Sequence, residues 1–117
     1  MSRSSPVALA LLAVVFVTAL AGSAQAVVIR GSLADGGRWR PARVSIDRGD
    51  RVVWRAVDGD HNVRAYRGNW SYFRDLPEGE RVRKRFRSRG TFRFVCTIHG
   101  NVADGTCSGM CGRVVVG

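Results

Sequence analysis

The side chains best suited to chemistry lie in and around FVCTIHG, residues 94–100, where Cys96 and His99 are three positions apart. The other histidine of the chain, His61, lies upstream in DHNV, and Met110 lies downstream in SGMCG. Thiolate and thioether sulfur suit Cu(I), and imidazole nitrogen suits Cu(II). A set of two histidines, one cysteine and a weakly bound methionine is typical of a mononuclear copper centre that transfers electrons.

Each of these donors also has an ordinary structural role. Cys96 could pair in a disulfide, as cysteines of secreted proteins often do, but a chain with three cysteines leaves one unpaired within a monomer. A bond between Cys107 and Cys111, four positions apart, would leave Cys96 as the free thiolate. Met110 could instead fill a gap in a hydrophobic core. The residues alone leave both alternatives open.

Two other kinds of metal site fit the residues less well. Zinc also binds cysteine and histidine, but a thioether adds nothing to a zinc site, and its fourth ligand would have to be water or a carboxylate. A binuclear copper centre needs a second cysteine close to the first on the ligand loop. Cys107 and Cys111 lie too far past His99 to match that pattern.

The elements that must position these donors read as short strands. We expect strands at residues 27–29, 44–46, 52–57, 61–66, 81–86, 91–96 and 113–116. Such strands, separated by Gly and Asp turns, favour an all-β sandwich or barrel. Residues 70–73, WSYF, are ambiguous between a strand and packed loop aromatics. In the alternation of this strand, Lys84 falls on the same, buried side as Val82 and Phe86. We therefore expect it near a sheet edge, where a charge also blocks association with another strand.

Residues 41–117 resemble the plastocyanin/azurin family of cupredoxins, most closely its small secreted bacterial members. RGDRVVWRAVDGDHNV is similar to the strand-turn-strand that delivers the family's first histidine ligand, here His61. GTFRFVCTIHG is similar to its cysteine strand and loop, with Cys96 and His99, and GMCGRVVV to its axial methionine, Met110, and last strand. The resemblance implies an all-β Greek-key β-sandwich that holds one copper ion, Cu(I) or Cu(II), near one end.

The resemblance also assigns roles to the neighbours of the ligands. Asn62 follows the first histidine and Thr97 follows the cysteine. In the family, the Asn ties down the loop that begins at the Cys, and such contacts orient the ligands of a metal. The family further implies that His99 points towards solvent through an apolar patch, where electrons pass.

The chain departs from the family between the loop histidine and the methionine. Common members have only a few residues there, whereas this chain has the ten-residue segment GNVADGTCSG, residues 100–109. The pair Cys107 and Cys111 is also unusual. Our hypothesis is that the Gly-rich segment bulges outward while a small Cys107–Cys111 disulfide loop holds Met110 in place.

The N-terminus is typical of a secretory signal peptide. Arg3 is followed by an apolar run at residues 7–20 and by an A-x-A cleavage pattern at residues 24–26. We therefore expect a signal peptide at residues 1–26, a cupredoxin domain at residues 27–117, and a secreted, periplasmic or cell-envelope location. An uncleaved membrane anchor is the alternative, but the apolar run is short for a spanning helix.

Net charge indicates the kind of partner. The chain carries a formal charge of +10, and the mature chain keeps +9 because Arg3 is the one charged residue of the leader. A basic surface attracts an acidic redox protein or an anionic membrane surface. The densest basic run, residues 81–89, lacks the interleaved aromatics of a single-strand nucleic-acid platform, so we expect no specific nucleic acid.

The function that these observations favour is one-electron transfer by a secreted, monomeric blue-copper protein. A copper protein for storage, delivery or buffering is the alternative, and a copper-free basic binding module on the same fold is a third possibility. An enzyme is not expected, because the copper oxidases and nitrite reductases built from this fold need several domains.

Overall fold

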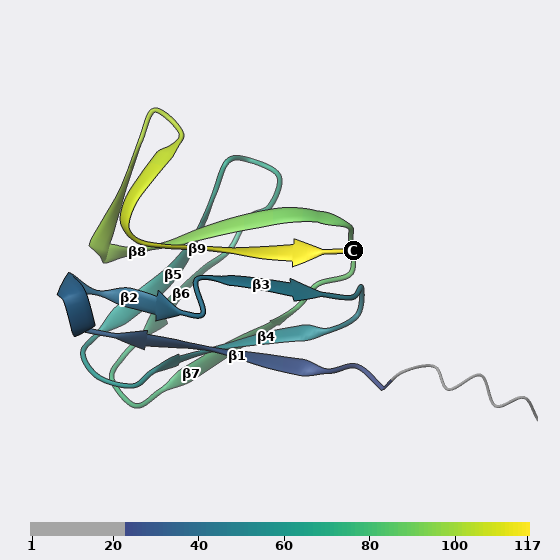
Figure 1. Ribbon diagram of the computed structural model, residues 1–117, viewed down its shortest axis with the longest axis horizontal. Helices are drawn as coiled ribbons and strands as arrows, with labels where there is room; N and C mark the ends of the chain where they lie inside the picture. Colours follow the sequence, from purple (N-terminus) through teal and green to yellow (C-terminus); the bar gives the residue numbers. More distant parts are fainter. Residues whose placement is uncertain (1–22) are drawn as a thin grey trace, which may run out of the picture.

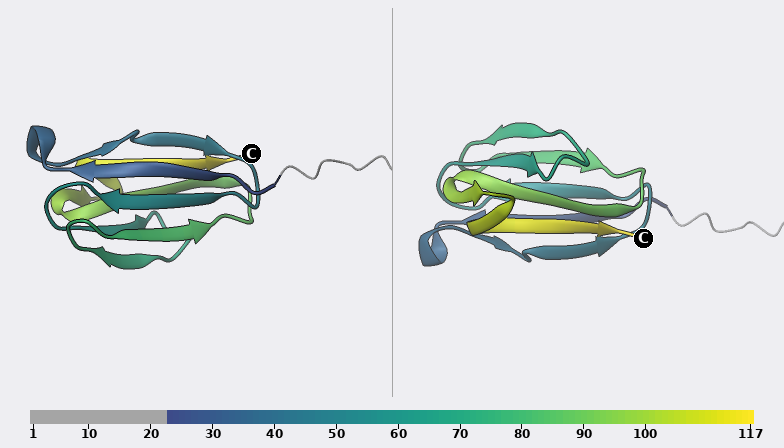
Figure 2. Two further views of the ribbon diagram at one scale, coloured as in Figure 1. Left: turned by 90° about the horizontal axis from the view of Figure 1, so that it is seen from below. Right: turned by 90° about the horizontal axis from the view of Figure 1, so that it is seen from above.

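The computed structural model describes residues 23–117, which form two β-sheets packed face to face (Figures 1 and 2). The first sheet has the order β2-β1-β4-β7 and the second the order β3-β9-β8-β5-β6. The first contains β1 (Ala26–Ser32), β2 (Arg38–Arg40), β4 (Arg51–Ala56) and β7 (Arg81–Arg85). The second contains β3 (Arg43–Ile46), β5 (His61–Tyr66), β6 (Phe73–Leu76), β8 (Gly90–Ala103) and β9 (Thr106–Val116). The expected all-β sandwich is confirmed.

A 3₁₀ turn, η1 (Ala34–Gly36), connects β1 to β2. None of the helical segments in residues 23–117 is long and apolar enough to cross a membrane. Residues 1–22 of the expected signal peptide lie outside the described residues, and Ala26, its last expected residue, is the first residue of β1.

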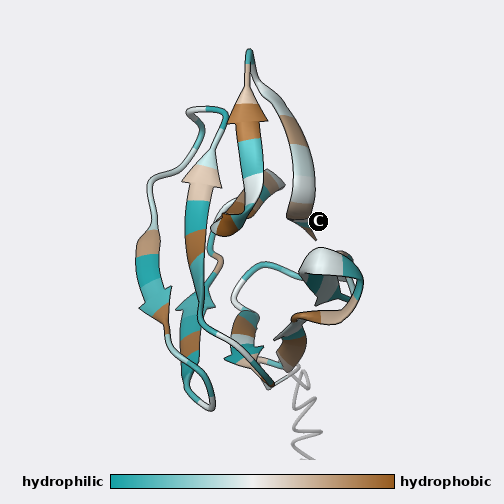
Figure 3. Cartoon of the chain, turned by 90° about the vertical axis from the view of Figure 1, so that its left-hand side faces the viewer, coloured by the Kyte–Doolittle hydropathy of each residue, from teal (hydrophilic) through white to brown (hydrophobic). Residues whose placement is uncertain are grey.

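Alternating side chains build the core between the two sheets. In β4 the buried residues are Val52, Trp54 and Ala56, with less buried residues between them, and Figure 3 shows the same alternation of hydrophobic and hydrophilic residues along the strands. The Phe94 ring packs edge-on against Trp54 at a centroid distance of 5.3 Å and against Trp39 at 5.6 Å. Edge-to-face pairs of this kind add to the stability gained from burial, so aromatic contacts tie the two sheets together.

Two short strands, β2 and β6, were not expected from the sequence. β2 has a single buried residue, Trp39, and β6 has only Leu76 buried while Phe73 is 49% exposed. Neither segment shows the alternation that predicts a strand, because each contributes one side chain to the core. Of the ambiguous WSYF segment, only Phe73 enters β6. Trp70 and Tyr72 precede the strand and stack in parallel at 5.7 Å.

The edge position expected for Lys84 is confirmed. β7 is the last strand of its sheet, and the Lys84 ammonium lies 5.7 Å from the ring centroids of both Tyr72 and Phe86. Lysine buries its aliphatic stem in this way while its charge stays near solvent. Burial desolvates the Tyr72 phenol and raises its pKa above the ordinary value, and the charge of Arg74 partly opposes that shift.

The segment at residues 100–109 differs from the expected Gly-rich bulge. It extends β8 and β9 into a paired hairpin arm, with Gly100 opposite Gly109 and Ala103 opposite Thr106. Asp104 and Gly105 form its two-residue turn, both with positive φ (52° and 72°). Asp-Gly is a favoured sequence for such hairpin turns, so local turn chemistry orders the segment, which projects from the sandwich in Figure 1.

Candidate metal centre

The site forms where the pairing of β8 and β9 breaks. Val95 is opposite Cys111, and the next regular pair is Gly100 with Gly109. Four residues of β8, positions 96–99, therefore face one residue of β9, Met110. This irregularity brings Cys96, His99 and Met110 to the same place, whereas a regular hairpin would point alternate residues to opposite faces.

His61 reaches the same place from another strand. It is the first residue of β5 and directly follows the Asp58-Gly59-Asp60 turn. Its Nε2 lies 2.7 Å from the backbone carbonyl oxygen of Asp58. A carbonyl oxygen can only accept a hydrogen bond, so Nε2 carries the proton, and in the neutral ring Nδ1 is then a free acceptor. That Nδ1 faces Cys96.

The three donor atoms lie within metal-binding distance of one another. Cys96 Sγ is 3.8 Å from His61 Nδ1 and 3.6 Å from His99 Nδ1, and the three atoms all lie within 4.8 Å of one another. Ligands at roughly 2.0–2.3 Å from one metal ion, in tetrahedral to trigonal geometry, are about 3.5–3.8 Å apart. The two sulfur–nitrogen distances therefore fit a single first-row metal ion, and the sulfur and two imidazoles of the cluster suit copper.

Burial distinguishes the donors from one another. His61 is 2% exposed and Cys96 is fully buried, while His99 is half-buried. His99 is thus the donor nearest to solvent. Two exposed apolar residues lie at the same end: Ile98, which is 55% exposed and adjacent to His99, and Leu33 at 47%.

Met110 is completely buried beside His99. A Cβ atom built on Gly37 would lie 2.8 Å from His99 Cγ and 3.4 Å from Met110 Sδ. One glycine thus borders both side chains. A disulfide joins Cys107 to Cys111 across Met110, and Cys96 is the free cysteine.

Asn62 and Thr97 form a two-way contact beside the donors. Asn62 Nδ2 donates to Thr97 Oγ1 at 2.7 Å, and the Thr97 backbone N–H donates to Asn62 Oδ1 at 2.9 Å. Asn62 is buried. The pair joins the residue after His61 to the residue after Cys96, and so fixes two donors from different strands relative to each other.

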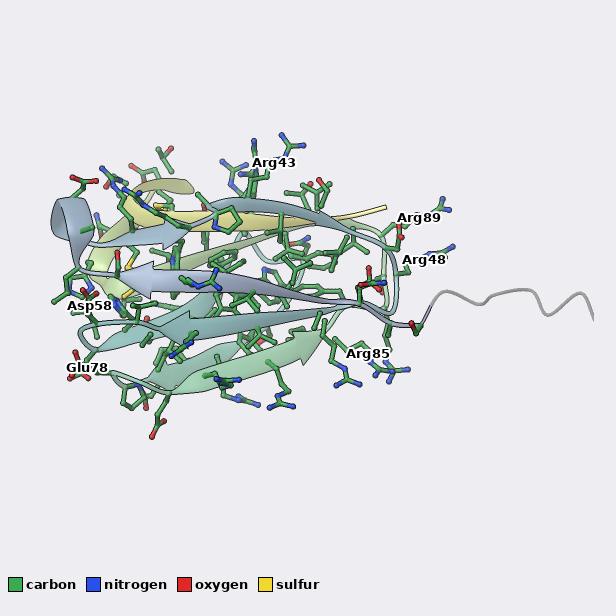
Figure 4. All side chains as sticks on the ribbon, turned by 60° about the horizontal axis from the view of Figure 1, so that its bottom comes forward. Arg43, Arg48, Asp58, Glu78, Arg85 and Arg89 are labelled. Atoms are coloured by element: carbon green, nitrogen blue, oxygen red, sulfur yellow. A yellow bond between two sulfur atoms is a disulfide. The ribbon has the colours of Figure 1, made fainter. Side chains whose placement is uncertain are left out.

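Although the chain is basic overall, acidic residues lie at the end of the sandwich that holds the site. Asp58 and Glu78 lie at the end of the sandwich that holds His61, while Arg48, Arg85 and Arg89 lie at the opposite end (Figure 4). Asp58 Oδ1 accepts a hydrogen bond from the Leu33 N–H at 2.7 Å. The basic run at residues 81–89 therefore extends away from the metal centre.

Sequence reasoning named the three residues of the cluster and Met110 beside them, but it missed the residues that enclose them. Gly37 and Trp39, whose ring centroid is 5.9 Å from that of His61, belong to the η1–β2 region. Nothing in that region suggests a metal site. The one local signal was the Asp35-Gly36-Gly37 turn, which predicts a change of chain direction but not what the turn packs against.

Comparisons with known proteins agree with this geometry. No protein-family model and no curated protein matches the chain. Among solved structures, pseudoazurin from Methylobacterium extorquens AM1 is 25% identical with a TM-score of 0.61, covering 79% of this chain and 75% of that chain. A purple cupredoxin from Nitrosopumilus maritimus is 22% identical with a TM-score of 0.59, covering 80% and 99%.

An enzyme with copper is also similar in structure. A Cu-containing nitrite reductase from Thermus scotoductus is 19% identical with a TM-score of 0.59, and the match covers 78% of this chain. The chain spans only 22% of that reductase. The chain therefore has the cupredoxin fold, and it carries at one end of the sandwich the histidine–cysteine–histidine cluster that is typical of a blue-copper site.

Proposed function

We propose that the protein is a secreted blue-copper protein that carries single electrons between redox partners. His61, Cys96 and His99 would hold one copper ion, with Met110 as a weak axial ligand. The observation that carries this proposal is the convergence of three donor atoms within 4.8 Å at a site where a buried methionine is the neighbour. Copper, when bound, supplies a Cu(I)/Cu(II) couple, and no substrate is transformed.

Residues around the cluster fix the positions of the donors. The Asp58 carbonyl keeps the proton of His61 on Nε2, and the Asn62–Thr97 contact fixes the start of the Cys96 loop. A rigid donor set limits the rearrangement that must accompany each change of charge. Half-buried His99, with Ile98 beside it, is the proposed point of contact for electron exchange.

Localisation and partner are part of the proposal. The A-x-A pattern and the Cys107–Cys111 disulfide both suit an oxidising, extracytoplasmic compartment. The net positive charge favours an acidic redox protein, because long-range attraction depends on the total charge. We propose a monomeric electron carrier rather than an enzyme; the matches to the purple cupredoxin and to pseudoazurin extend over most of those chains and support this reading.

The visible spectrum of the purified protein after addition of Cu(II) tests the proposal. We expect one copper per chain and an intense blue colour from charge transfer between the Cys96 thiolate and copper. Cys96→Ala should abolish the colour. A double variant, Cys107→Ser with Cys111→Ser, removes cysteines outside the donor set and should keep it.

A colourless complex, or colour that persists in the Cys96→Ala variant, would refute the copper assignment. Voltammetry then separates electron transfer from copper storage or delivery. An electron carrier shows a reversible couple with fast self-exchange, whereas a storage protein shows slow or irreversible exchange and releases its copper to a competing chelator.

A further inference from the structure

Three arginines lie in a row across the outer face of the five-stranded sheet. Arg43 of β3 is directly opposite Arg113 of β9, and Arg113 is directly opposite Arg93 of β8. Their sequence neighbours Val44, Val114 and Phe94 are buried between the sheets, so the arginines point outward, as Arg43 does in Figure 4. We call these three residues the arginine ladder.

The ladder is electrostatically unfavourable as it stands. Arg113 and Arg93 form an antiparallel pair, in which directly opposed Cβ atoms are about 4.5–5.5 Å apart and like charges are destabilising. Arg43 lies opposite Arg113 on the parallel neighbouring strand, about 4.8 Å away. Among residues 23–117, the one ion pair joins Arg40 to Asp35, and no side-chain hydrogen bond involves a guanidinium of the ladder. Arg93 and Arg113 are also half-buried, which weakens the screening of their repulsion by water.

The ladder lines a hollow on the surface. Besides its three arginines, the lining includes Arg67, Tyr66, Cys107 and Cys111. Arg67 Nε donates to the carbonyl oxygen of Gly105 at 3.0 Å, so its guanidinium is held against the turn of the hairpin arm. No Asp or Glu is among the residues that line the hollow. Four arginines thus line one hollow that has no Asp or Glu in its lining, and among residues 23–117 none of the four is in an ion pair.

We propose that this hollow binds a compact anion that carries at least two phosphate or carboxylate groups. The planar guanidinium fork matches either group with two parallel hydrogen bonds. Neighbouring strands are about 4.8 Å apart, so two adjacent arginines of the ladder can each bind one anionic group of the same small molecule. The hairpin arm borders the hollow on one side, through Thr106 and Cys107. The hollow lies outside the copper cluster and does not depend on a bound metal.

Calorimetric titration of the purified protein at constant ionic strength tests the site, with inorganic pyrophosphate and citrate as probes. Orthophosphate and acetate are the single-group controls. We expect pyrophosphate or citrate to bind at least about tenfold more tightly than its control, because two arginines are engaged instead of one. The ratio between the two probes tells whether the site prefers phosphate or carboxylate.

Arg113→Gln, at the centre of the ladder, should weaken that binding at least about tenfold, since it removes a charge-assisted contact. Without anion, the same variant should unfold at an equal or higher temperature than the unmodified protein, because like-charge repulsion is relieved. Arg89→Gln is the matched control: it removes the same charge outside the hollow and should leave the binding unchanged.

Equal weakening by Arg113→Gln and Arg89→Gln would overturn the proposal, because only net charge would then matter. Absence of binding by both probes would also overturn it. If, in that case, an oligoglutamate peptide bound in an Arg113-dependent way, the ladder would be a docking surface for an acidic protein instead. Lower thermal stability of Arg113→Gln with unchanged binding would make Arg113 a structural residue.

Discussion

Gly37→Ala is the substitution that most directly tests how the metal centre is enclosed. Gly37 follows η1 with φ 112° and ψ 118°, a conformation that residues with a Cβ rarely adopt. A Cβ there would lie 2.5 Å from His99 Cβ, 2.8 Å from His99 Cγ and 3.4 Å from Met110 Sδ. The alanine methyl group can fit only if His99 or the η1 backbone moves.

The expected cost follows from these two effects. A strained backbone conformation costs about 1–3 kcal/mol, and overpacking a tight site costs about 1–3 kcal/mol more. We expect Gly37→Ala to lower the free energy of unfolding by about 2–6 kcal/mol. Gly36→Ala is the control, because Gly36 also has a positive φ, 82°, but nothing lies within 4 Å of its Cβ position. It should cost only about 1–2 kcal/mol.

Denaturant unfolding with and without Cu(II) gives both quantities. Copper stabilises the fold according to its affinity for the native state. A displaced His99 should weaken copper binding by about tenfold or more in Gly37→Ala, which reduces the copper-dependent stabilisation by about 1.4 kcal/mol. Gly36→Ala should leave the copper-dependent stabilisation unchanged. If the two variants match in stability and in copper-dependent stabilisation, Gly37 does not hold His99 and the packing argument is wrong.

Further changes probe the donors and the charge. Met110→Leu should raise the reduction potential, because losing a weak donor disfavours Cu(II), and Met110→Gln should lower it; voltammetry without a shift in either variant would exclude Met110 as axial ligand. Alkylation of the copper-free, denatured, non-reduced protein should modify one cysteine, Cys96, and three modified cysteines in the mass spectrum would mean that no disulfide forms. Asn62→Ala should lower the free energy of unfolding by about 1–3 kcal/mol through two lost hydrogen bonds, and an unchanged denaturation midpoint would contradict this. Electron-transfer rates with a negatively charged acceptor should fall as the salt concentration rises. The triple variant Arg83→Glu, Lys84→Glu, Arg85→Glu should flatten or invert that trend. If the triple variant keeps the original salt dependence, residues 81–89 are only a solvated strand face.

Much of the site could be predicted because its donors have unusual chemistry. The chain has two histidines and three cysteines, so few combinations of ligands are possible. The strands with clear alternation, such as residues 52–57, were also predictable, because burial of every second side chain leaves a local signature. β2 and β6 could not be found in this way, since a strand that buries one side chain has no period.

The register of β8 against β9 could not be predicted from the sequence, for a different reason. Pairing depends on hydrogen bonds and packing between segments, and a slip of one residue moves every side chain to the other face. The break between Val95 and Gly100 is therefore a property of the two strands together. The Asp-Gly turn at Asp104 signals a hairpin locally, but it does not reveal that four residues would face Met110.

The sequence by itself determined the chemistry of the donors, the all-β class and the net charge, because these follow from residue identity and local period. Only the tertiary structure decided that His61 Nδ1 lies 3.8 Å from Cys96 Sγ across 35 positions of sequence. It also decided that Arg89 lies far from the metal centre and that Arg43, Arg93 and Arg113 form a row. Distances between strands depend on how the sheets pair and pack, and no local pattern along one segment encodes them.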